Sequence, residues 1–247
     1  MRNKSTTDAI LKFTELCYSN FNNKNVTIGT FLDLSKAFDT LNHDLLCRKL
    51  CRYGIRGNMN KWFQSYLSYR SQYVSIGNSD SSVLNVNCGV PQGSILGPLL
   101  FLIYINDMHK CTSLDLIHFA DDTTAISQGP TIEDAVATVA RELEKVDRWL
   151  CSNKLSLNIN KSSFLIFTNK KLSNIPIISI RSVPIKYVDC FKFLGIMVDN
   201  KLSYSNHVNN VCSKVNRCNG IFKKLSSHIP LYILTKIRWF KLFRKFL

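Results

Sequence analysis

The chain has 247 residues, of which 32 are Lys or Arg and 17 are Asp or Glu, giving a formal net charge of +15 at pH 7. Nucleic acid and an anionic membrane surface would both satisfy such a basic balance. Hydrophobic residues make up 45%, which excludes disorder as the reason for the charge. No apolar run reaches the ~18 residues that span a bilayer, and the N-terminus lacks a signal-peptide core. We therefore expect an intracellular protein of nucleus and cytoplasm that is not secreted.

The nine cysteines are odd in number and include no Cys-x-x-Cys pair. Cys47 and Cys51 would share a helical face, but no companion His or Cys pair with metal-ligand spacing follows. We expect reduced and mostly buried thiols.

The first predicted elements are a helix, a strand and a second helix. Apolar residues recur at helical spacing over residues 9–17, after polar residues that can cap a helix. A β-branched and apolar run over 26–32 then reaches Asp33, and a helical pattern over 37–50 follows almost at once. Catalytic ligands commonly lie at such a strand-to-helix junction, where the strand fixes the position and the loop gives access.

A helix over residues 59–67 is predicted next, with its apolar side chains on one face. Two strands, 72–76 and 83–88, enclose a polar loop and lead into a turn rich in Gly and Pro, followed by a helix over 94–107. In this turn Gly93 allows the backbone to come close to a ligand, whereas Gln92 has no evident structural role.

Two apolar runs of β-prone residues meet at Asp121 and Asp122, a pattern that predicts a hairpin with acid at its tip. Adjacent carboxylates can simply form a turn. If the two carboxylates lie between apolar strands, however, their desolvation and mutual repulsion destabilise the fold by several kcal/mol, unless a bound cation offsets the negative charge. If the strand before Asp33 lies beside this hairpin, three carboxylates converge on one edge of a sheet. Such clusters bind Mg²⁺ or Mn²⁺, and two ions about 3.5–4 Å apart carry out phosphoryl or nucleotidyl transfer.

The rest of the chain predicts a long helix from the cap residue Thr131 and a strand over 164–167. A strand pair, 175–180 with 183–188, and a strand over 191–198 follow. Residues 201–247 hold ten Lys or Arg and no Asp or Glu, and four aromatic residues are interleaved with the basic ones near the C-terminal end (Trp239, Phe240, Phe243, Phe246). Basic helices with aromatic residues can follow a phosphate backbone or lie on a membrane.

Three stretches in this order carry a family resemblance, namely 31–39 (FLDLSKAFD), 89–98 (GVPQGSILGP) and 119–122 (FADD). Together they resemble the reverse transcriptases of non-LTR retrotransposons, of the jockey-like kind, from about residue 5 to the C-terminus. The resemblance implies an α+β right-hand polymerase palm, with an antiparallel sheet and helices packed on one face, partial fingers and C-terminal basic helices. It implies an RNA-directed DNA polymerase that adds deoxynucleotides (dNTP) to a DNA primer on an RNA template, with nucleic acid rather than a membrane as partner.

The same resemblance assigns the metal site. Asp33, Asp121 and the backbone carbonyl of Leu34 would hold Mg²⁺, for which Mn²⁺ can substitute. Asp122 would ligate more weakly or orient the primer end.

Further residues match family motifs for nucleotide and primer. Phe38 matches a bulky gate against the 2′-hydroxyl, although its spacing equally fits a core aromatic. Gln92 and Gly93 would pack against the incoming nucleotide. Lys161 would lie near the triphosphate and protonate the departing pyrophosphate, although a lysine after a turn is commonly just solvated. The stretch Phe193-Leu194-Gly195 resembles the hairpin that grips the primer's 3′ end, and an ordinary apolar strand fits it equally well.

Residues 1–200 are expected to form the palm with partial fingers, and residues 201–247 a basic helical thumb or connection segment. The resemblance also implies a fragment, without an endonuclease domain, the N-terminal fingers and part of the thumb. Two alternatives stay open, namely a non-catalytic nucleic-acid-binding remnant and another palm polymerase, such as an intron-type reverse transcriptase or an RNA-dependent RNA polymerase.

Overall fold

The computed structural model describes residues 5–170, 172 and 174–225. The chain divides into two compact units, residues 1–189 and 190–247. The functional boundary that the sequence predicts at residue 200 stays a prediction. Within the described part of the chain, no helix is long and apolar enough to cross a membrane.

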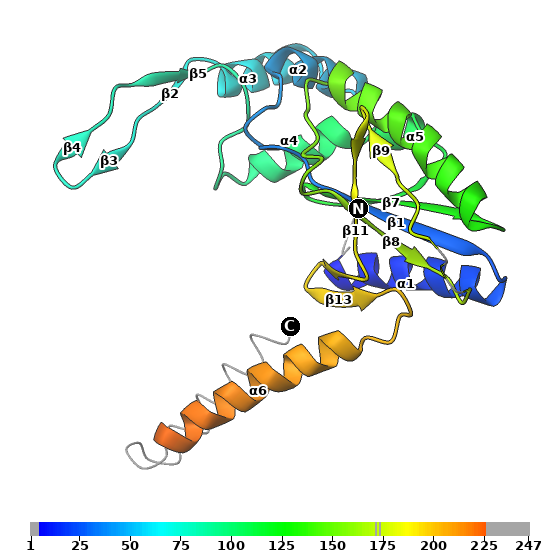
Figure 1. Ribbon diagram of the computed structural model, residues 1–247. Coiled ribbons are helices and arrows are strands. Elements are labelled where there is room, and N and C mark those ends of the chain that lie inside the picture. Colours follow the sequence, from blue (N-terminus) through cyan, green and yellow to red (C-terminus); the bar gives the residue numbers. More distant parts are fainter. Residues whose placement is uncertain (1–4, 171, 173, 226–247) are drawn as a thin grey trace. The chain divides into compact units, whose positions relative to one another are not determined.

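A five-stranded sheet forms the centre of the first unit, and its strand order is β11-β8-β1-β7-β6 (Figure 1). Neighbouring strands are antiparallel except for β11 and β8. The strands are β1 (Val26–Leu32), β6 (Asp115–Phe119), β7 (Asp122–Gly129), β8 (Ser163–Phe167) and β11 (Lys186–Tyr187). Every residue of the central strand β1 is buried, including the polar Thr27 and Thr30.

Helices cover both faces of this sheet. On one face lies α5 (Ile132–Ser152), which is capped by the predicted residue Thr131. The hydroxyl of Ser127 on β7 donates a hydrogen bond to the carbonyl of Ala135 in this helix. On the other face lies α1 (Thr6–Asn22), whose Phe13 packs against Phe31 and Phe167 (Figure 1). The expectation that helices pack on one face only is therefore wrong, because β1 is apolar on both sides and each side must be covered.

The helices α2 (His43–Arg52), α3 (Gly57–Leu67) and α4 (Leu96–Ile105) share one hydrophobic core with α5. A short 3₁₀ turn, η1 (Met108–Lys110), follows α4. The predicted helix over 37–50 begins later than expected, since residues 35–41 form turns. Lys36 has a φ of 46°, which interrupts a helix, and Asn42 caps α2 by accepting a hydrogen bond from the Leu45 N–H at 3.0 Å.

An exposed ribbon extends from the end of α3 (Figure 1). It consists of β2 (Arg70–Gln72) paired with β5 (Leu84–Val86) and β3 (Ser75–Ile76) paired with β4 (Ser79–Asp80). This matches the predicted pair of strands around a polar loop.

The predicted strand pair after β8 forms only where its two members meet. β9 (Ser179–Ile180) and β10 (Val183–Pro184) join through Arg181, whose guanidinium binds both carboxylate oxygens of Asp147 on α5 at 2.7 and 2.8 Å. The rest of the predicted first strand, residues 175–178, is irregular, and residues 186–187 instead form β11 beside β8.

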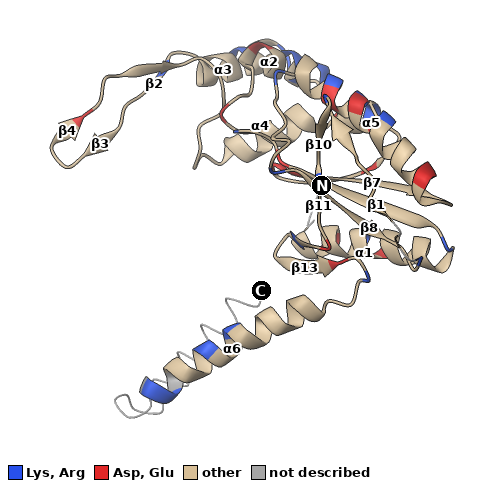
Figure 2. Ribbon diagram, in the orientation of Figure 1, with Lys and Arg blue, Asp and Glu red and all other residues tan. Residues whose placement is uncertain are grey.

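The second unit contains a hairpin and a helix. β12 (Cys190–Phe193) pairs with β13 (Ile196–Asp199), and α6 (Ser205–Leu225) follows. The Asp199 carboxylate accepts hydrogen bonds from the backbone of Lys201, Ser203 and Tyr204, which fixes the connection between β13 and α6. Figure 2 shows Lys and Arg along α6. The four aromatic residues and five of the ten basic residues predicted for 201–247 lie outside the described residues.

All nine cysteines are free thiols. Only Cys17 and Cys47 are buried, whereas Cys88, Cys151 and Cys212 are exposed and the other four are half-buried. The expectation of mostly buried thiols is therefore wrong, because several cysteines lie on outward faces of helices or in turns.

Candidate active site

The predicted acids come from two adjacent strands of the central sheet. Asp33 follows directly after β1, whose last residue, Leu32, pairs with Thr123 of β7. Asp121 lies in the two-residue turn of the β6–β7 hairpin, and Asp122 is the first residue of β7. The prediction that the Asp33 strand lies beside the acidic hairpin is confirmed.

Strand alternation also puts Asp33 and Asp122 on the same face of the sheet. Phe31 and Thr124 are directly opposite each other in the β1–β7 ladder, so their side chains project to one side. Asp33 lies two residues after Phe31, and Asp122 lies two residues before Thr124. The two carboxylates therefore project to that side as well.

The charges of Asp33 and Asp121 act on the carboxyl of Asp122. The pKa of Asp122 is raised above its ordinary value, first by burial of the carboxyl and then by the negative charges of Asp121 and Asp33. Like charges close together oppose ionisation, and a bound cation would relieve that opposition.

The tip of the hairpin carries backbone strain. Ala120, the residue before Asp121, has a φ of 53°, a left-handed conformation that residues with a side chain rarely adopt. Such strain persists only where the surrounding structure fixes it, and it is often found at functional sites. Here the β6–β7 ladder fixes it on both sides of the turn.

A loop before β8 holds the backbone that follows β1. The Asn158 N–H donates to the Asp33 carbonyl, and the Ser35 N–H donates to the Ser156 carbonyl, both at 2.8 Å. These two hydrogen bonds flank Leu34 and Leu157, which face each other as an isolated antiparallel β-bridge. Because this pair exchanges no hydrogen bond of its own, the carbonyl of Leu34 is directed away from Leu157. Because Leu157 lies on the β8 side of β1, the carbonyl of Leu34 points to the β7 side, where the acids lie.

The donor set fits a hard divalent ion. In the part of the chain that the structure describes, no three Asp, Glu, His or Cys side chains, the three predicted acids included, form a group that could hold a metal ion by side chains alone. Mg²⁺ is usually held by one or two carboxylates, waters and substrate phosphates rather than by protein side chains alone. Carboxylates that repel one another beside a backbone carbonyl match that mode of binding.

The two other predicted motif segments are joined to each other by hydrogen bonds. The Val90 N–H donates to the Phe38 carbonyl and the Gly89 N–H donates to the Leu41 carbonyl, both at 2.8 Å. The side chain of Phe38 is half-buried and packs against Phe101 with 4.7 Å between ring centroids. It lies in a turn, not at the start of a helix as expected.

Gln92 and Gly93 are exposed in the turn that precedes α4. The Gln92 amide donates to the Asp39 carboxylate at 2.8 Å. Gln92 lines a pocket of about 750 Å³ together with Lys36, Asp39 and Arg70. Gly93 has a φ of 79°, and no atom lies within 4 Å of where a Cβ would be.

Lys161 is exposed in a turn attached to Asp33. Its N–H donates to the Asn158 carbonyl, and the hydroxyl of the next residue, Ser162, accepts a hydrogen bond from the Asp33 N–H at 3.2 Å. The structure therefore brings the turn of Lys161 to the same end of β1 as the acids.

Phe193, Leu194 and Gly195 belong to the second compact unit. Phe193 is buried, while Leu194 and Gly195, with φ values of 46° and 96°, form the turn between β12 and β13. The sequence predicts one strand over 191–198, and the structure has a hairpin there.

Sequence reasoning missed several residues of this region. Ser162 and Asp39 are examples, since their partners Asp33 and Gln92 lie 129 and 53 residues away. For Ser162, the one indication in the sequence is its position next to Lys161. Arg70, which lines the same pocket as Gln92, gave none.

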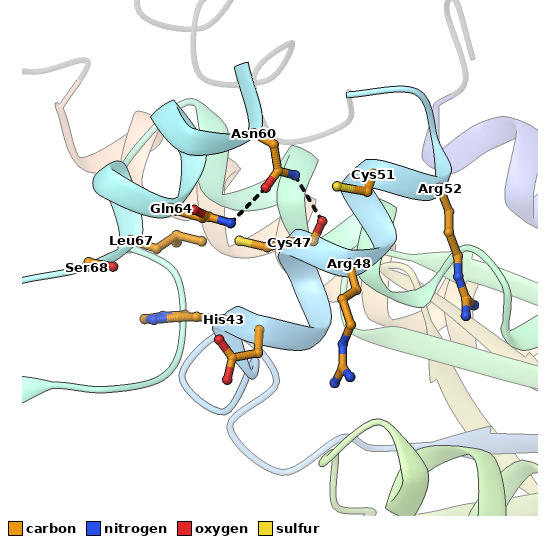
Figure 3. Close-up of a pocket in the computed structure, with 10 residues that line it drawn as sticks. His43, Cys47, Arg48, Cys51, Arg52, Asn60, Gln64, Leu67 and Ser68 are labelled. Atoms are coloured by element: carbon orange, nitrogen blue, oxygen red, sulfur yellow. Dashed lines mark hydrogen bonds between the residues drawn. The ribbon is translucent and has the colours of Figure 1, made fainter. Parts of the chain in front are cut away.

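A separate pocket of about 800 Å³ lies between α2 and α3 (Figure 3). Asn60 donates to the Cys47 carbonyl at 3.0 Å and accepts from Gln64 at 3.0 Å, so its amide joins the two helices. None of the predicted site residues lines this pocket.

The fold and the acidic site define a polymerase palm, and comparison with known proteins gives its family. The reverse transcriptase (RNA-dependent DNA polymerase) family matches residues 1–198. This chain belongs to that family, as its motifs indicate.

The curated relatives are polymerases of mobile elements. The RNA-directed DNA polymerase from mobile element jockey of Drosophila melanogaster is 29% identical over 76% of this chain and 21% of the relative. The probable RNA-directed DNA polymerase from transposon X-element of the same species is 28% identical over 96% of this chain and 26% of the relative. The chain thus spans about a fifth to a quarter of the length of these relatives, and the predicted jockey-like resemblance is confirmed.

Solved telomerase structures share the fold. The apo telomerase from Candida tropicalis, truncated from its C-terminal domain, has a TM-score of 0.55 at 15% identity, covering 82% of this chain and 40% of that chain. The telomerase from Candida albicans in complex with a fragment of telomeric RNA has a TM-score of 0.54 at 15% identity, covering 81% and 35%. The predicted α+β palm is confirmed.

Proposed function

We propose that this chain is the catalytic palm of an RNA-directed DNA polymerase of a non-LTR retrotransposon. It adds deoxynucleotides to the 3′ end of a DNA primer on an RNA template. The observation that carries the proposal is the meeting of Asp33 with Asp121 and Asp122 at the ends of β1 and the β6–β7 hairpin, where each charge raises the pKa of Asp122.

Asp33, Asp121 and the carbonyl of Leu34 would hold Mg²⁺, or Mn²⁺ in its place. Bound divalent ions supply activation of the primer hydroxyl and stabilisation of the leaving phosphate. The chain itself fixes the positions of the ligands, because β1 pairs with strands on both sides. Asp122 lies on the same face as Asp33 and orients the primer end. Positioning is the main task of protein groups in phosphoryl transfer.

Phe38 serves as the gate against ribonucleotides. Its backbone is fixed by Val90 and its ring by Phe101, so the ring cannot easily yield to an additional 2′-hydroxyl. Phe38→Ala is expected to relax the preference for deoxynucleotides, whereas Phe38→Tyr keeps a ring and the preference. Unchanged discrimination by the alanine variant counts against this role.

The remaining assignments concern the substrate's phosphates and the primer. Gln92 and Gly93 contact the incoming nucleotide from the exposed turn before α4. Lys161, on the turn bound to Asp33, donates a proton to the departing pyrophosphate. The turn at Phe193, Leu194 and Gly195 supports the primer's 3′ end.

Primer extension on an RNA template with deoxynucleotides and Mg²⁺ tests the proposal. Asp121→Asn is expected to abolish incorporation. Asp115→Asn is the matched control, because Asp115 is exposed at the opposite end of the same hairpin. Incorporation that persists in Asp121→Asn contradicts the proposed site. A parent that incorporates nothing but binds nucleic acid in a salt-sensitive manner is instead a non-catalytic binding module.

A further inference from the structure

Three stacked side chains lie on α3 and at the start of β2, and they are here called the stacking ladder (Trp62, Tyr66 and Arg70). The rings of Trp62 and Tyr66 are nearly parallel, with an angle of 13° and 5.6 Å between their centroids. The guanidinium carbon of Arg70 lies 4.6 Å from the centroid of the Tyr66 ring. The Tyr66 ring therefore contacts both of the other side chains.

Neighbouring groups hold the stacking ladder in place. The Nε of Arg70 donates to the Tyr66 carbonyl at 2.7 Å, which fixes the guanidinium plane. The Trp62 ring meets the ring of Phe63 edge-on at 5.0 Å, and Phe63 is anchored in the core. Little side-chain freedom is therefore lost when another flat group stacks on the ladder.

The stacking ladder is not part of the core. The buried face of α3 consists of Asn60, Phe63 and Leu67, whereas 51% of Trp62 and 62% of Met59 is exposed. The predicted apolar face of this helix is therefore divided, with Phe63 and Leu67 buried and these two residues exposed. Tyr66 is half-buried and packs against the core, which leaves the Trp62 end of the stack exposed as a candidate binding surface.

The charge of this region favours a polyanion. Between Asp44 and Asp80 the sequence contains six Lys or Arg and no acid. Lys49 is buried and paired with Asp107. The other five are exposed, namely Arg48, Arg52, Arg56, Lys61 and Arg70. Figure 2 shows basic residues on α2. Flat π-faces within a positive surface are the combination that binds unpaired nucleic-acid strands.

Polar pockets continue from the Arg70 end of the stacking ladder. A pocket of about 550 Å³ is lined by Arg70 and by three asparagines (Asn42, Asn85, Asn87), with Asp44 as its one acidic residue. Amide side chains can pair with base edges as donors and acceptors. Arg70 also lines the pocket that reaches Gln92. An unpaired strand stacked on the ladder thus has a polar path toward the candidate active site.

We propose that the stacking ladder binds single-stranded nucleic acid by stacking unpaired bases on Trp62 and on the guanidinium of Arg70. The neighbouring Lys and Arg hold the phosphates. This binding does not depend on nucleotidyl transfer, so it can be tested separately from the proposed polymerase activity.

The test measures binding of the full chain to two labelled oligonucleotides by fluorescence anisotropy. One is a single-stranded oligouridylate of about 12 nucleotides, and the other is an abasic strand with the same number of phosphates. The parent is expected to bind the strand with bases roughly tenfold more tightly than the abasic one. Asp121→Asn is expected to show the same difference.

Substitutions in α3 and at Arg70 then separate stacking from charge and from folding. Trp62→Ala is expected to remove the preference for bases, and Trp62→Phe to keep most of it. Arg70→Lys keeps the charge but loses the flat face, so it should reduce the preference without weakening abasic binding. Met59→Ala, a change at the exposed apolar neighbour, should have no effect. Thermal unfolding of each variant confirms that it is folded.

Two results would overturn the proposal. If Trp62→Ala keeps the parent's preference for bases, the bases do not stack on the ladder. If Met59→Ala and Trp62→Ala reduce binding of both strands equally, this surface contributes to binding without recognising bases, and the proposed stacking is wrong.

Discussion

The side-chain amide of Gln92 donates a hydrogen bond to the carboxylate of Asp39 at 2.8 Å. This contact is part of a row in which residues 38–41 bind residues 88–92, including the bonds from Val90 to Phe38 and from Gly89 to Leu41. The turn that presents Gln92 is thus fixed by the segment that follows Asp33. The geometry of the nucleotide side of the site therefore depends on how closely these two backbones approach.

Gly89→Ala is expected to destabilise the protein by roughly 3 kcal/mol. A Cβ at this position would lie 2.7 Å from the Asp39 carbonyl oxygen, and the φ of +85° is unfavourable for alanine. Gly93→Ala is the matched control. It has a similar φ of +79° but open space around the Cβ, so only about 1 kcal/mol is expected. Urea unfolding measures both, and equal losses would show that the close approach to Asp39 is unimportant.

The acid-bearing elements could be predicted from sequence because their signals are local. Strand ends can be predicted where an apolar run stops at an acid. One such run ends at Asp33, and two others meet at Asp121. To predict that Asp33 lies beside the acidic hairpin, it had to be assumed that β1 pairs with β7, and the structure shows this pairing.

Features that depend on distant residues could not be predicted. Ala37 and Leu41 fit helical spacing with α2, yet both are buried within turns because they pack into the core before Asn42 starts the helix. Met59 and Trp62 fit one apolar face with Phe63, and only the packing of α3 shows which of them faces outward. The support of Asp33 by Ser162 spans 129 residues and has no pattern in the sequence.

The free energy of unfolding is expected to fall by about 2 kcal/mol between pH 7 and pH 5 because of His118. Burial, and to a lesser degree the charge of His109, lowers the pKa of His118 to about 4. Below pH 6.5 the unfolded chain takes up a proton that the folded chain does not, so stability is lost as the pH falls from 6.5 toward 4. Urea unfolding of the parent and of His118→Phe measures the effect.

The variant His118→Phe should show a smaller loss over this range. Glu142 does not interfere, because its pKa is lowered to about 2 by hydrogen bonds, first from Lys145 and then from the Ser113 N–H. Its contribution is lost only as the pH falls from 4.5 toward 2. If parent and variant lose the same stability between pH 7 and pH 5, His118 is not held neutral.

Lys49→Met is expected to cost roughly 3 kcal/mol of stability. Its buried ammonium donates to the Tyr104 carbonyl and to the Asp107 carboxylate, both at 2.6 Å, and lies 4.6 Å from the centroid of the Trp149 ring. It therefore joins α2, α4 and α5. Removing the charge leaves the carboxylate of Asp107 without its partner, and Asp107→Asn in the same chain should restore part of the loss. Thermal and urea unfolding report both variants.

The control for Lys49 is Lys145→Met. Lys145 also pairs with a carboxylate, that of Glu142 at 2.7 Å, but 42% of its side chain is exposed. Less than about 1 kcal/mol is expected for an exposed pair of this kind. A loss at Lys49 no larger than that at Lys145 would mean that Lys49 does not hold the three helices together.

Divalent ions are expected to raise the unfolding temperature of the parent, and this effect should shrink in Asp33→Asn and Asp121→Asn. Burial, and then the charges of Asp121 and Asp33, raise the pKa of Asp122, so the metal-free site is under electrostatic repulsion. A bound cation offsets that repulsion and stabilises the folded state by mass action.

Without Mg²⁺, Asp122→Asn should itself unfold at a higher temperature than the parent, because one of three like charges is removed. Thermal unfolding in MgCl₂, compared with NaCl of equal ionic strength, separates binding from screening. Asp115→Asn, at the far end of the hairpin, is expected to respond to Mg²⁺ as the parent does. An equal Mg²⁺ response in the parent and in Asp33→Asn would place the ion somewhere other than at the end of β1.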